Sequence, residues 1–354
     1  MPRTATSSGG PTAHSPTGGR RSSRGRETVD GGYHRAVADV TDLVTLERIR
    51  AAARRLEGVA LRTPLLAWDG STWLKPESLQ PVGSFKIRGA YAKISSLTDA
   101  QRSAGVITYS SGNHAQGVAR AARILGVRAT IVMPDKAPAI KVAGVERDGA
   151  RIVRCGPASD ERRAVAERLA TDEGLTLVPP YDDLEVIAGQ GTIGLEVVDQ
   201  LPGLTSVFIP VGGGGLSSGI ATAVKSLRPD ARVIGVEPEL AADARDSLRA
   251  GRIVAWSADD VGRTSADGMR ALQLGDAPFA HLVRYLDEIV TVSEDEIAAA
   301  TREAAARARL VVEPSGATAL AAHLSGRAGS DAARVVVISG GNVDPDRYAA
   351  ILAG

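Results

Sequence analysis

"GVITYSSGNHAQGVARAARILGVRATIVMP", residues 105–134, contains one complete strand–helix–strand unit and decides the fold. The β-rich runs 105–110 and 128–134 predict strands, and residues 114–126 between them predict a helix. Two strands joined by a helix at this spacing are typical of a parallel sheet. The polar turn around residues 110–114 follows the first strand, and ligands bind beyond the carboxyl ends of strands in open parallel sheets.

The same alternation continues along the chain. Residues 45–58 predict an amphipathic helix stopped by Gly58. Further strands are predicted at 150–156, 175–180, 206–211, 232–238, 288–293 and 334–341, and helices at 138–149, 159–174, 216–227 and 294–310. Polar or glycine-rich loops directly follow three of the strands, in both halves of the chain. The pattern predicts an α/β protein with two open parallel-sheet domains and a ligand cleft between them.

Composition excludes several classes of function. The 354 residues carry a formal net charge of +1, and their basic residues are scattered, which argues against a nucleic-acid partner. No apolar run is long enough to span a membrane. A single cysteine, Cys155, cannot form an internal disulfide and favours a cytoplasmic location. Residues 1–40 are rich in Ser, Gly, Pro and Arg and predict a disordered N-terminal extension.

One lysine stands out because lysines are rare here. Of 42 basic residues, only six are lysine and the rest are arginine. "SFKIRG", residues 84–89, nevertheless keeps Lys86. An amine can lose its proton and act as a nucleophile, whereas a guanidinium practically cannot. The plain alternative for Lys86 is a solvated surface cation.

A run of four glycines separates a predicted strand from a predicted helix in "PVGGGGL", residues 210–216. Backbone N–H groups at such a turn, with a helix dipole behind them, can bind a phosphate closely. The run does not match the P-loop and matches the dinucleotide fingerprint poorly. An oxidoreductase that used this loop for a pyrophosphate would leave Lys86 without a role. A flexible turn is the structural alternative.

Two further turns carry polar side chains. Ser110, Ser111, Asn113 and His114 lie at a strand-to-helix junction, where hydroxyl, amide and N–H groups suit a carboxylate. A simple helix N-cap explains that turn equally well. Ser339 follows the last predicted strand, and its hydroxyl could pair with a heterocycle or belong to an ordinary turn.

An amine, a phosphate-binding loop, a carboxylate-binding turn and a neutral partner for a ring nitrogen are what pyridoxal phosphate and an amino acid require. From about residue 43 to its end, the chain resembles the fold-type II (tryptophan synthase β-like) pyridoxal-phosphate enzymes. Within them it is similar to threonine/serine dehydratases and serine racemases. The matching stretches are "LKPESLQPVGSFKIRGA", "SSGNHAQG", "VIAGQGTIGLE", "PVGGGGL", "IGVEPE", "VVEPSGA" and "SGGNVD".

The resemblance implies a role for each residue at the cofactor. Lys86 would bind pyridoxal phosphate covalently, Phe85 would lie beside the ring, and Ser339 would face the pyridine nitrogen. Asn113 would bond the 3-hydroxyl and, with Ser110, Ser111 and His114, would hold the substrate carboxylate. The phosphate would be bound by Gly212, Gly213, Gly214, Gly215 and Leu216.

It also implies the domains and the assembly. Residues 41–105 and 184–354 would form a large cofactor-binding domain, and residues 106–183 a small α/β domain. A C-terminal regulatory domain is not expected, because the chain stops soon after Ser339. We expect a small amino-acid substrate and a homodimer or homotetramer.

The implied reaction is dehydration of L-threonine or L-serine. Lys86 would remove the α-proton, the β-hydroxyl would leave, and the released aminoacrylate would hydrolyse to a 2-oxo acid and ammonia. Tyr181 in "PPYDD" resembles the aromatic residue usual in threonine dehydratases. The alternatives are a serine racemase and a threo-3-hydroxyaspartate dehydratase of the same family.

Two features of the sequence resemble those of the serine racemases. The Ser111 hydroxyl could serve as a catalytic acid or base on the ring face opposite Lys86, and an N-cap is its equally plausible role. "VEPELAAD" resembles the racemase metal site, which implies Glu237, the Ala241 carbonyl and Asp243 as ligands of Mg²⁺ or Ca²⁺. An exposed acidic turn explains that segment equally well.

Overall fold

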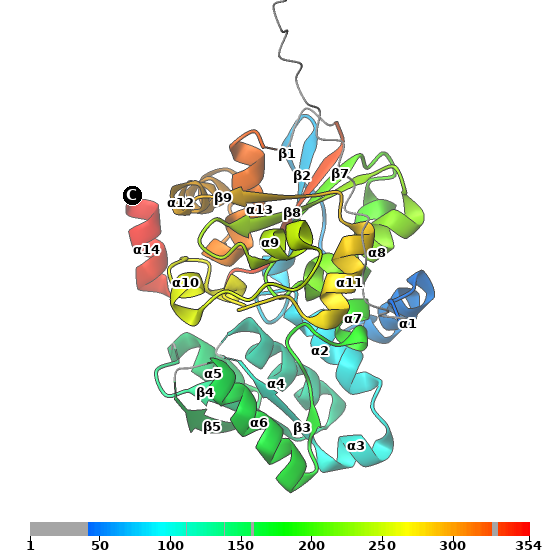
Figure 1. Ribbon diagram of the computed structural model, residues 1–354, viewed down its shortest axis with the longest axis vertical. Helices are drawn as coiled ribbons and strands as arrows, with labels where there is room; N and C mark the ends of the chain where they lie inside the picture. Colours follow the sequence, from blue (N-terminus) through cyan, green and yellow to red (C-terminus); the bar gives the residue numbers. More distant parts are fainter. Residues whose placement is uncertain (1–41, 111, 138, 157–158, 328–331) are drawn as a thin grey trace, which may run out of the picture. The chain divides into compact units, whose positions relative to one another are not determined.

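Two sheets organise the chain. A computed structural model describes residues 42–354 except 111, 138, 157–158 and 328–331, so the predicted disordered extension lies outside the described residues. One sheet has six strands in the order β1-β2-β10-β7-β8-β9, and the other has four in the order β5-β4-β3-β6 (Figure 1). Helices alternate with these strands along the chain, which confirms the predicted α/β class.

The six-stranded sheet combines early and late parts of the sequence. Its strands are β1 (Leu66–Asp69), β2 (Thr72–Pro76), β7 (Ser206–Pro210), β8 (Arg232–Pro238), β9 (Glu288–Val292) and β10 (Arg334–Ile338). Every neighbouring pair is parallel except β1 and β2, which form an antiparallel hairpin at one edge. Sequence patterning did not predict this hairpin, because its two short strands do not belong to a strand–helix–strand unit.

The four-stranded sheet comes from one continuous part of the chain and is entirely parallel. Its strands are β3 (Val106–Tyr109), β4 (Ala129–Pro134), β5 (Arg151–Cys155) and β6 (Thr176–Leu177). The strand predicted at 175–180 is much shorter in the structure. Pro179 and Pro180 have no backbone N–H to donate to a neighbouring strand, so β6 ends before them.

The helices have the following bounds: α1 (Leu46–Leu56), α2 (Lys86–Ser95), α3 (Asp99–Ala104), α4 (Asn113–Leu125), α5 (Ala139–Arg147), α6 (Ser159–Glu173), α7 (Leu184–Gln200), α8 (Gly215–Leu227), α9 (Asp243–Ala250), α10 (Ala258–Gly262), α11 (Asp276–Tyr285), α12 (Glu294–Glu303), α13 (Pro314–Leu324) and α14 (Pro345–Ala353). The helix predicted at 294–310 changes to a π-helical turn over Ala304–Ala308. Among the described residues, none of the helices has the length and apolar character that a membrane crossing requires.

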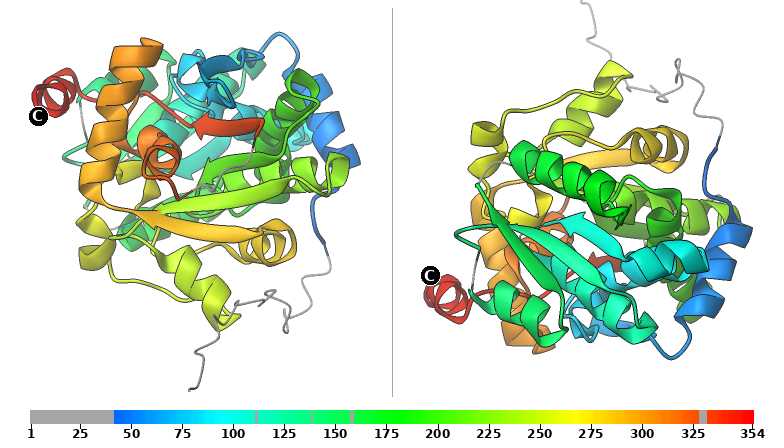
Figure 2. Two further views of the ribbon diagram at one scale, coloured as in Figure 1. Left: turned by 90° about the horizontal axis from the view of Figure 1, so that it is seen from above. Right: turned by 90° about the horizontal axis from the view of Figure 1, so that it is seen from below.

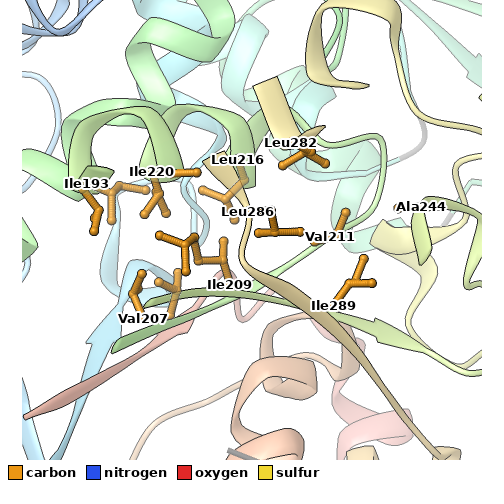
Figure 3. Packing of buried hydrophobic residues seen from close by; sticks show 14 of the residues in the cluster. Ile193, Val207, Ile209, Val211, Leu216, Ile220, Ala244, Leu282, Leu286 and Ile289 are labelled. Atoms are coloured by element: carbon orange, nitrogen blue, oxygen red, sulfur yellow. The ribbon is translucent and has the colours of Figure 1, made fainter. Parts of the chain in front are cut away.

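Alternating side chains of the large sheet divide its hydrophobic core between two faces. Val207 and Ile209 of β7 pack with Leu216 and Ile220 of α8 (Figure 3), whereas Phe208 belongs to a second cluster that includes residues of α12 and α13. A period of two along a strand places alternate side chains on opposite faces. Helices therefore cover both faces of this sheet (Figure 2).

Helices α2, α7 and α8 approach one another closely through glycines. A Cβ atom at Gly219 of α8 would overlap the backbone carbonyl of Ile187 and the backbone of Gly191, both in α7. Helix α2 contacts both α7 and α4, so it connects the cores of the two sheets. These helices thus fix the position of Lys86, which is the first residue of α2.

We predict that Gly219→Ala destabilises the protein strongly, because its Cβ meets backbone atoms that cannot rotate away. The expected loss in the free energy of unfolding is about 3 kcal/mol, at the upper end for overpacking. Urea denaturation followed by circular dichroism measures it. The matched control is Gly262→Ala, which has open space around it and should change stability little. Equal stability of the two variants would contradict the close packing of α7 and α8.

Candidate active site

One cavity of about 670 Å³ lies where the carboxyl ends of β3, β7 and β10 meet. Loops that follow the strands of open parallel sheets are the usual place for ligands. The cavity gathers most of the predicted site residues in one place. Those that line it are Phe85, Lys86, Ser110, Asn113, His114, Gly212, Gly213, Gly214, Gly215, Leu216 and Ser339. Ser111 lies outside the described residues.

Lys86 extends its amine into this cavity. Its Nζ lies 2.7 Å from the carbonyl oxygen of Pro180 and 5.1 Å from the ring centroid of Phe85. Protein atoms around the partly buried side chain displace water, and this desolvation lowers the pKa of the amine to about 8. About a tenth of the amine is therefore neutral at pH 7, far more than for an ordinary lysine, and a nucleophile or base requires this neutral form.

The N-terminus of α4 forms a second polar wall. Ser110 follows β3, its Oγ accepts from the N–H of Gly112 at 3.2 Å, and Gly112 is the N-cap of α4. The first N–H groups of a helix have no acceptor within the helix and attract anions. Lys141 lies beside this wall, with its Nζ 3.4 Å from the position a Cβ would occupy at Gly112, and Asp267 partly balances its positive charge. This wall suits a carboxylate.

The side chain of His114, which we expected to hold the substrate carboxylate, instead bonds to the backbone. Its Nε2 lies 2.9 Å from the carbonyl oxygen of Val178, so this nitrogen carries the proton and donates it. Burial, together with the charge of Lys86, lowers the pKa of His114 to about 3. The ring is therefore neutral, and its Nδ1 has no partner among the described residues. Only the backbone N–H of His114 remains as a donor to a carboxylate.

The glycine loop connects β7 to α8. Gly214 adopts φ +91° as the N-cap of α8, a conformation that favours glycine. A Cβ at Gly213 would overlap the ring of Tyr181, and one at Gly215 would lie 3.0 Å from the same residue. The glycines therefore allow Tyr181 to cover the loop closely. Backbone N–H groups and the positive end of α8 make the loop a suitable phosphate site.

Ser339 and three further polar residues complete the cavity. The buried Ser339 hydroxyl lies 3.4 Å from the carbonyl oxygen of Ser315. Lys141 and Asp267 form an ion pair at 2.6 Å. Burial, reinforced by the charge of Asp267, raises the pKa of Glu313 to about 7. Sequence reasoning missed Lys141, Asp267 and Glu313, although Lys141 is one of only six lysines and Glu313 lies within the quoted "VVEPSGA".

The predicted metal ligands lie apart from this cavity. Glu237 ends β8 next to Pro238, and its carboxylate accepts from the N–H groups of Ala244 and Arg245 at 3.0 and 2.9 Å. Asp243 is fully buried, and neither of its carboxylate oxygens has a partner among the described residues. Burial raises the pKa of both acids, and that of Glu237 is raised further by Asp243. Two buried carboxylates supply oxygen donors of the kind that fits a hard cation.

No larger acidic group is present in the ranges that the structure describes, where no cluster of three or more His, Cys, Asp or Glu side chains could hold a metal ion. A cation bound by Glu237 and Asp243 would therefore need backbone carbonyls and water as its other ligands.

Comparisons with known proteins identify relatives along nearly the whole chain. An L-threonine ammonia-lyase of Thermotoga maritima is 43% identical over 309 residues, 85% of this chain and 76% of that protein. An L-threo-3-hydroxyaspartate ammonia-lyase of Saccharomyces cerevisiae is 40% identical over 311 residues, 86% of this chain and 94% of that protein. A serine racemase of Schizosaccharomyces pombe is 39% identical over 325 residues, 90% of this chain and all of that protein.

Solved structures agree with this fold. The crystal structure of a threonine deaminase superposes with a TM-score of 0.80 at 45% identity, covering 85% of this chain and 99% of that one. A maize serine racemase superposes with a TM-score of 0.82 at 35% identity, covering 88% of this chain and 98% of that one. Residues 41–341 match the family described as "Pyridoxal-phosphate dependent enzyme", and the chain belongs to this family.

Proposed function

We propose that this protein is a pyridoxal-phosphate ammonia-lyase that converts L-threonine or L-serine to a 2-oxo acid and ammonia. One observation carries the proposal. The desolvated amine of Lys86 shares a single cavity with a glycine loop suited to a phosphate and a helix N-terminus suited to a carboxylate. The threonine and 3-hydroxyaspartate ammonia-lyases among the relatives support a β-hydroxy amino acid as the substrate.

The residues of the cavity fit the cofactor and the substrate. The N–H groups between Gly212 and Leu216 would bind the phosphate, and the Ser339 hydroxyl would pair with the ring nitrogen. Phe85 would lie beside the ring. At the N-terminus of α4, Ser110 and the backbone N–H groups of Asn113 and His114 would bind the substrate carboxylate, and the Asn113 side chain would bond the 3-hydroxyl. These partners would orient the Cα–H bond toward Lys86.

Lys86 would then act as the base. Pyridoxal phosphate, when bound, supplies an electron sink for the charge left at the α-carbon. Once the substrate's amine has replaced it on the cofactor, the freed Lys86 amine would take the α-proton, and its lowered pKa of about 8 suits a base that works near neutral pH. The β-hydroxyl would leave as water with a proton from the cofactor phosphate or a nearby group, and desolvation of the cavity would exclude competing water. The aminoacrylate would be released and would hydrolyse in solution.

We also propose the domain division expected from the sequence, with residues 106–183 as a small domain and residues 41–105 with 184–354 as the large one. The separate small sheet, formed by residues 106–177, supports it. A homodimer or homotetramer and a cytoplasmic location complete the proposal, and the single cysteine supports the location.

A serine racemase is the second candidate, and the buried acidic pair favours it. Glu237, the Ala241 carbonyl and Asp243 would bind Mg²⁺ or Ca²⁺, and the cation would be the partner that the Asp243 carboxylate oxygens lack among the described residues. Ser111 would act as the acid or base on the ring face opposite Lys86. The 39% identity to a serine racemase supports the same alternative.

We predict that Lys86→Ala lowers the rate of 2-oxo acid production by about 10³-fold or more, because it removes both the cofactor attachment and the base. The measurement is a panel of L-threonine, L-serine and L-threo-3-hydroxyaspartate, with chiral analysis of the remaining amino acid. Lys136→Ala, at an exposed position, is the control and should retain full activity.

Each outcome of this panel decides between functions. Ammonia release that survives in Lys86→Ala, or bound cofactor without any 2-oxo acid in the wild type, contradicts the proposed lyase. Conversion of L-serine to its D-isomer faster than elimination identifies the racemase instead.

The lowered pKa of Lys86 predicts how fast pyridoxal phosphate attaches at different pH values. Only the neutral amine attacks, and a pKa of about 8 makes it the major form above pH 8. The rate, followed by visible absorbance, should therefore rise about tenfold from pH 7 to pH 9 and then level off. Nα-acetyl-lysine amide, whose side-chain amine is free, is measured in the same buffers and corrects for titration of the cofactor itself. A rate that climbs as steeply beyond pH 9 as the reference amine would refute the lowered pKa.

For the acidic pair, we predict that millimolar Mg²⁺ or Ca²⁺ raises the thermal midpoint of the wild type by at least about 2 °C. Glu237→Gln and Asp243→Asn should lose this shift, because each removes a charged ligand. Glu239→Gln changes an exposed acid two residues from Glu237 and should keep the shift. The same shift in Asp243→Asn as in the wild type would place the cation elsewhere.

A further inference from the structure

The side-chain amide of Asn113 is held by two other side chains. Its Oδ1 accepts a hydrogen bond of 2.9 Å from Nδ2 of Asn342, and its Nδ2 donates to Oε1 of Glu313. An asparagine amide has two N–H donors and one carbonyl acceptor. One N–H of Asn113 therefore remains, and it has no second acceptor among the described residues. Asn113 and Glu313 both line the cavity, whereas Asn342 lies behind it.

Asn342 can hold Asn113 in only one orientation. Its Nδ2 also donates to the carbonyl oxygen of Val82 at 2.7 Å, so both of its N–H groups are engaged. Turning the Asn342 amide over would place its Oδ1 against two acceptor oxygens, those of Val82 and Asn113. Its Oδ1 instead lies against Gly83, where φ is +70° and a Cβ would overlap it. Hydrogen bonding thus selects this orientation, and the absence of a Cβ at Gly83 leaves room for the side chain.

Glu313 fixes the other end of the Asn113 amide. Its side chain is buried, and a Cβ at Gly340 would overlap its Oε1. Its Oε1 can accept from Asn113 as a carboxylate oxygen, and as the carbonyl oxygen when the group is protonated. If the Asn113 amide turned over, its oxygen would face this carboxylate and its nitrogen would face the donor of Asn342. The contact with Asn342 would then be repulsive in either protonation state of Glu313, so Asn113 must present an N–H to the cavity.

We propose that Asn342 and Glu313 are positioning residues that orient the Asn113 amide, so that its remaining N–H donates to the 3-hydroxyl oxygen of pyridoxal phosphate. This inference rests on the proposed function, because it requires the cofactor in the cavity. It also links three distant segments. Asn342 comes from the loop after β10, Glu313 precedes α13, and Val82 precedes Lys86.

The test is a double-mutant cycle on cofactor affinity. Asn342→Ala should weaken the equilibrium binding of pyridoxal phosphate about tenfold and shift the pH at which the visible band titrates. Asn113→Ala should do the same. In the double variant, the loss should stay within about threefold of either single one, because Asn342 acts only through Asn113. Asp346→Asn, an exposed change nearby, is the control and should bind like the wild type.

Variants of Glu313 test the same inference if the Asn342→Ala variant folds poorly. Glu313→Gln keeps an acceptor for Asn113 and should retain affinity within about threefold, whereas Glu313→Leu should lose about tenfold. Losses that multiply in the double variants, or equal affinity of Glu313→Gln and Glu313→Leu, would overturn the inference. A wild type that binds no pyridoxal phosphate would instead refute the proposed function itself.

Discussion

An amine taken out of bulk water needs an acceptor, and the Pro180 carbonyl supplies one to Lys86. This bond requires the segment between β6 and α7 to cross the cavity. Thr108 of β3 and His114 of α4 hold that segment through one carbonyl. Thr108 Oγ1 donates to the Val178 carbonyl at 2.7 Å, and His114 Nε2 donates to it at 2.9 Å. The amine is thereby kept accessible to a ligand while water around it is limited.

Close backbone approach places Lys86 there. A Cβ at Gly117 of α4 would lie 3.0 Å from the Lys86 carbonyl oxygen, and one at Gly89 of α2 would overlap the Gln190 side chain. These glycines lie inside helices, where each costs up to about 1 kcal/mol relative to alanine. The cost is offset by helix packing that brings the carboxyl ends of both sheets to one cavity. The stability of the fold and the geometry of the site are thus coupled through the same helices.

The parallel strands β3 to β10 were predictable because each is a short apolar run between a helix and a polar loop. Lys86 and the loop at Gly212 could also be predicted from the sequence, because lysine is rare in this chain and a run of four glycines is distinctive. Contacts between residues far apart in the sequence could not be predicted. Lys141 pairs with Asp267, 126 residues away, and no local pattern encodes that pairing. The end of β6 could have been predicted from Pro179 and Pro180, whereas the β1–β2 hairpin was missed because it lies outside the strand–helix–strand pattern.

Covalent attachment of the cofactor tests the central claim most directly. The purified protein is incubated with pyridoxal phosphate, reduced with borohydride, digested and analysed by mass spectrometry. The account predicts a pyridoxyl group on Lys86 alone among the six lysines. A modified lysine elsewhere, or no reducible attachment at all, would contradict it.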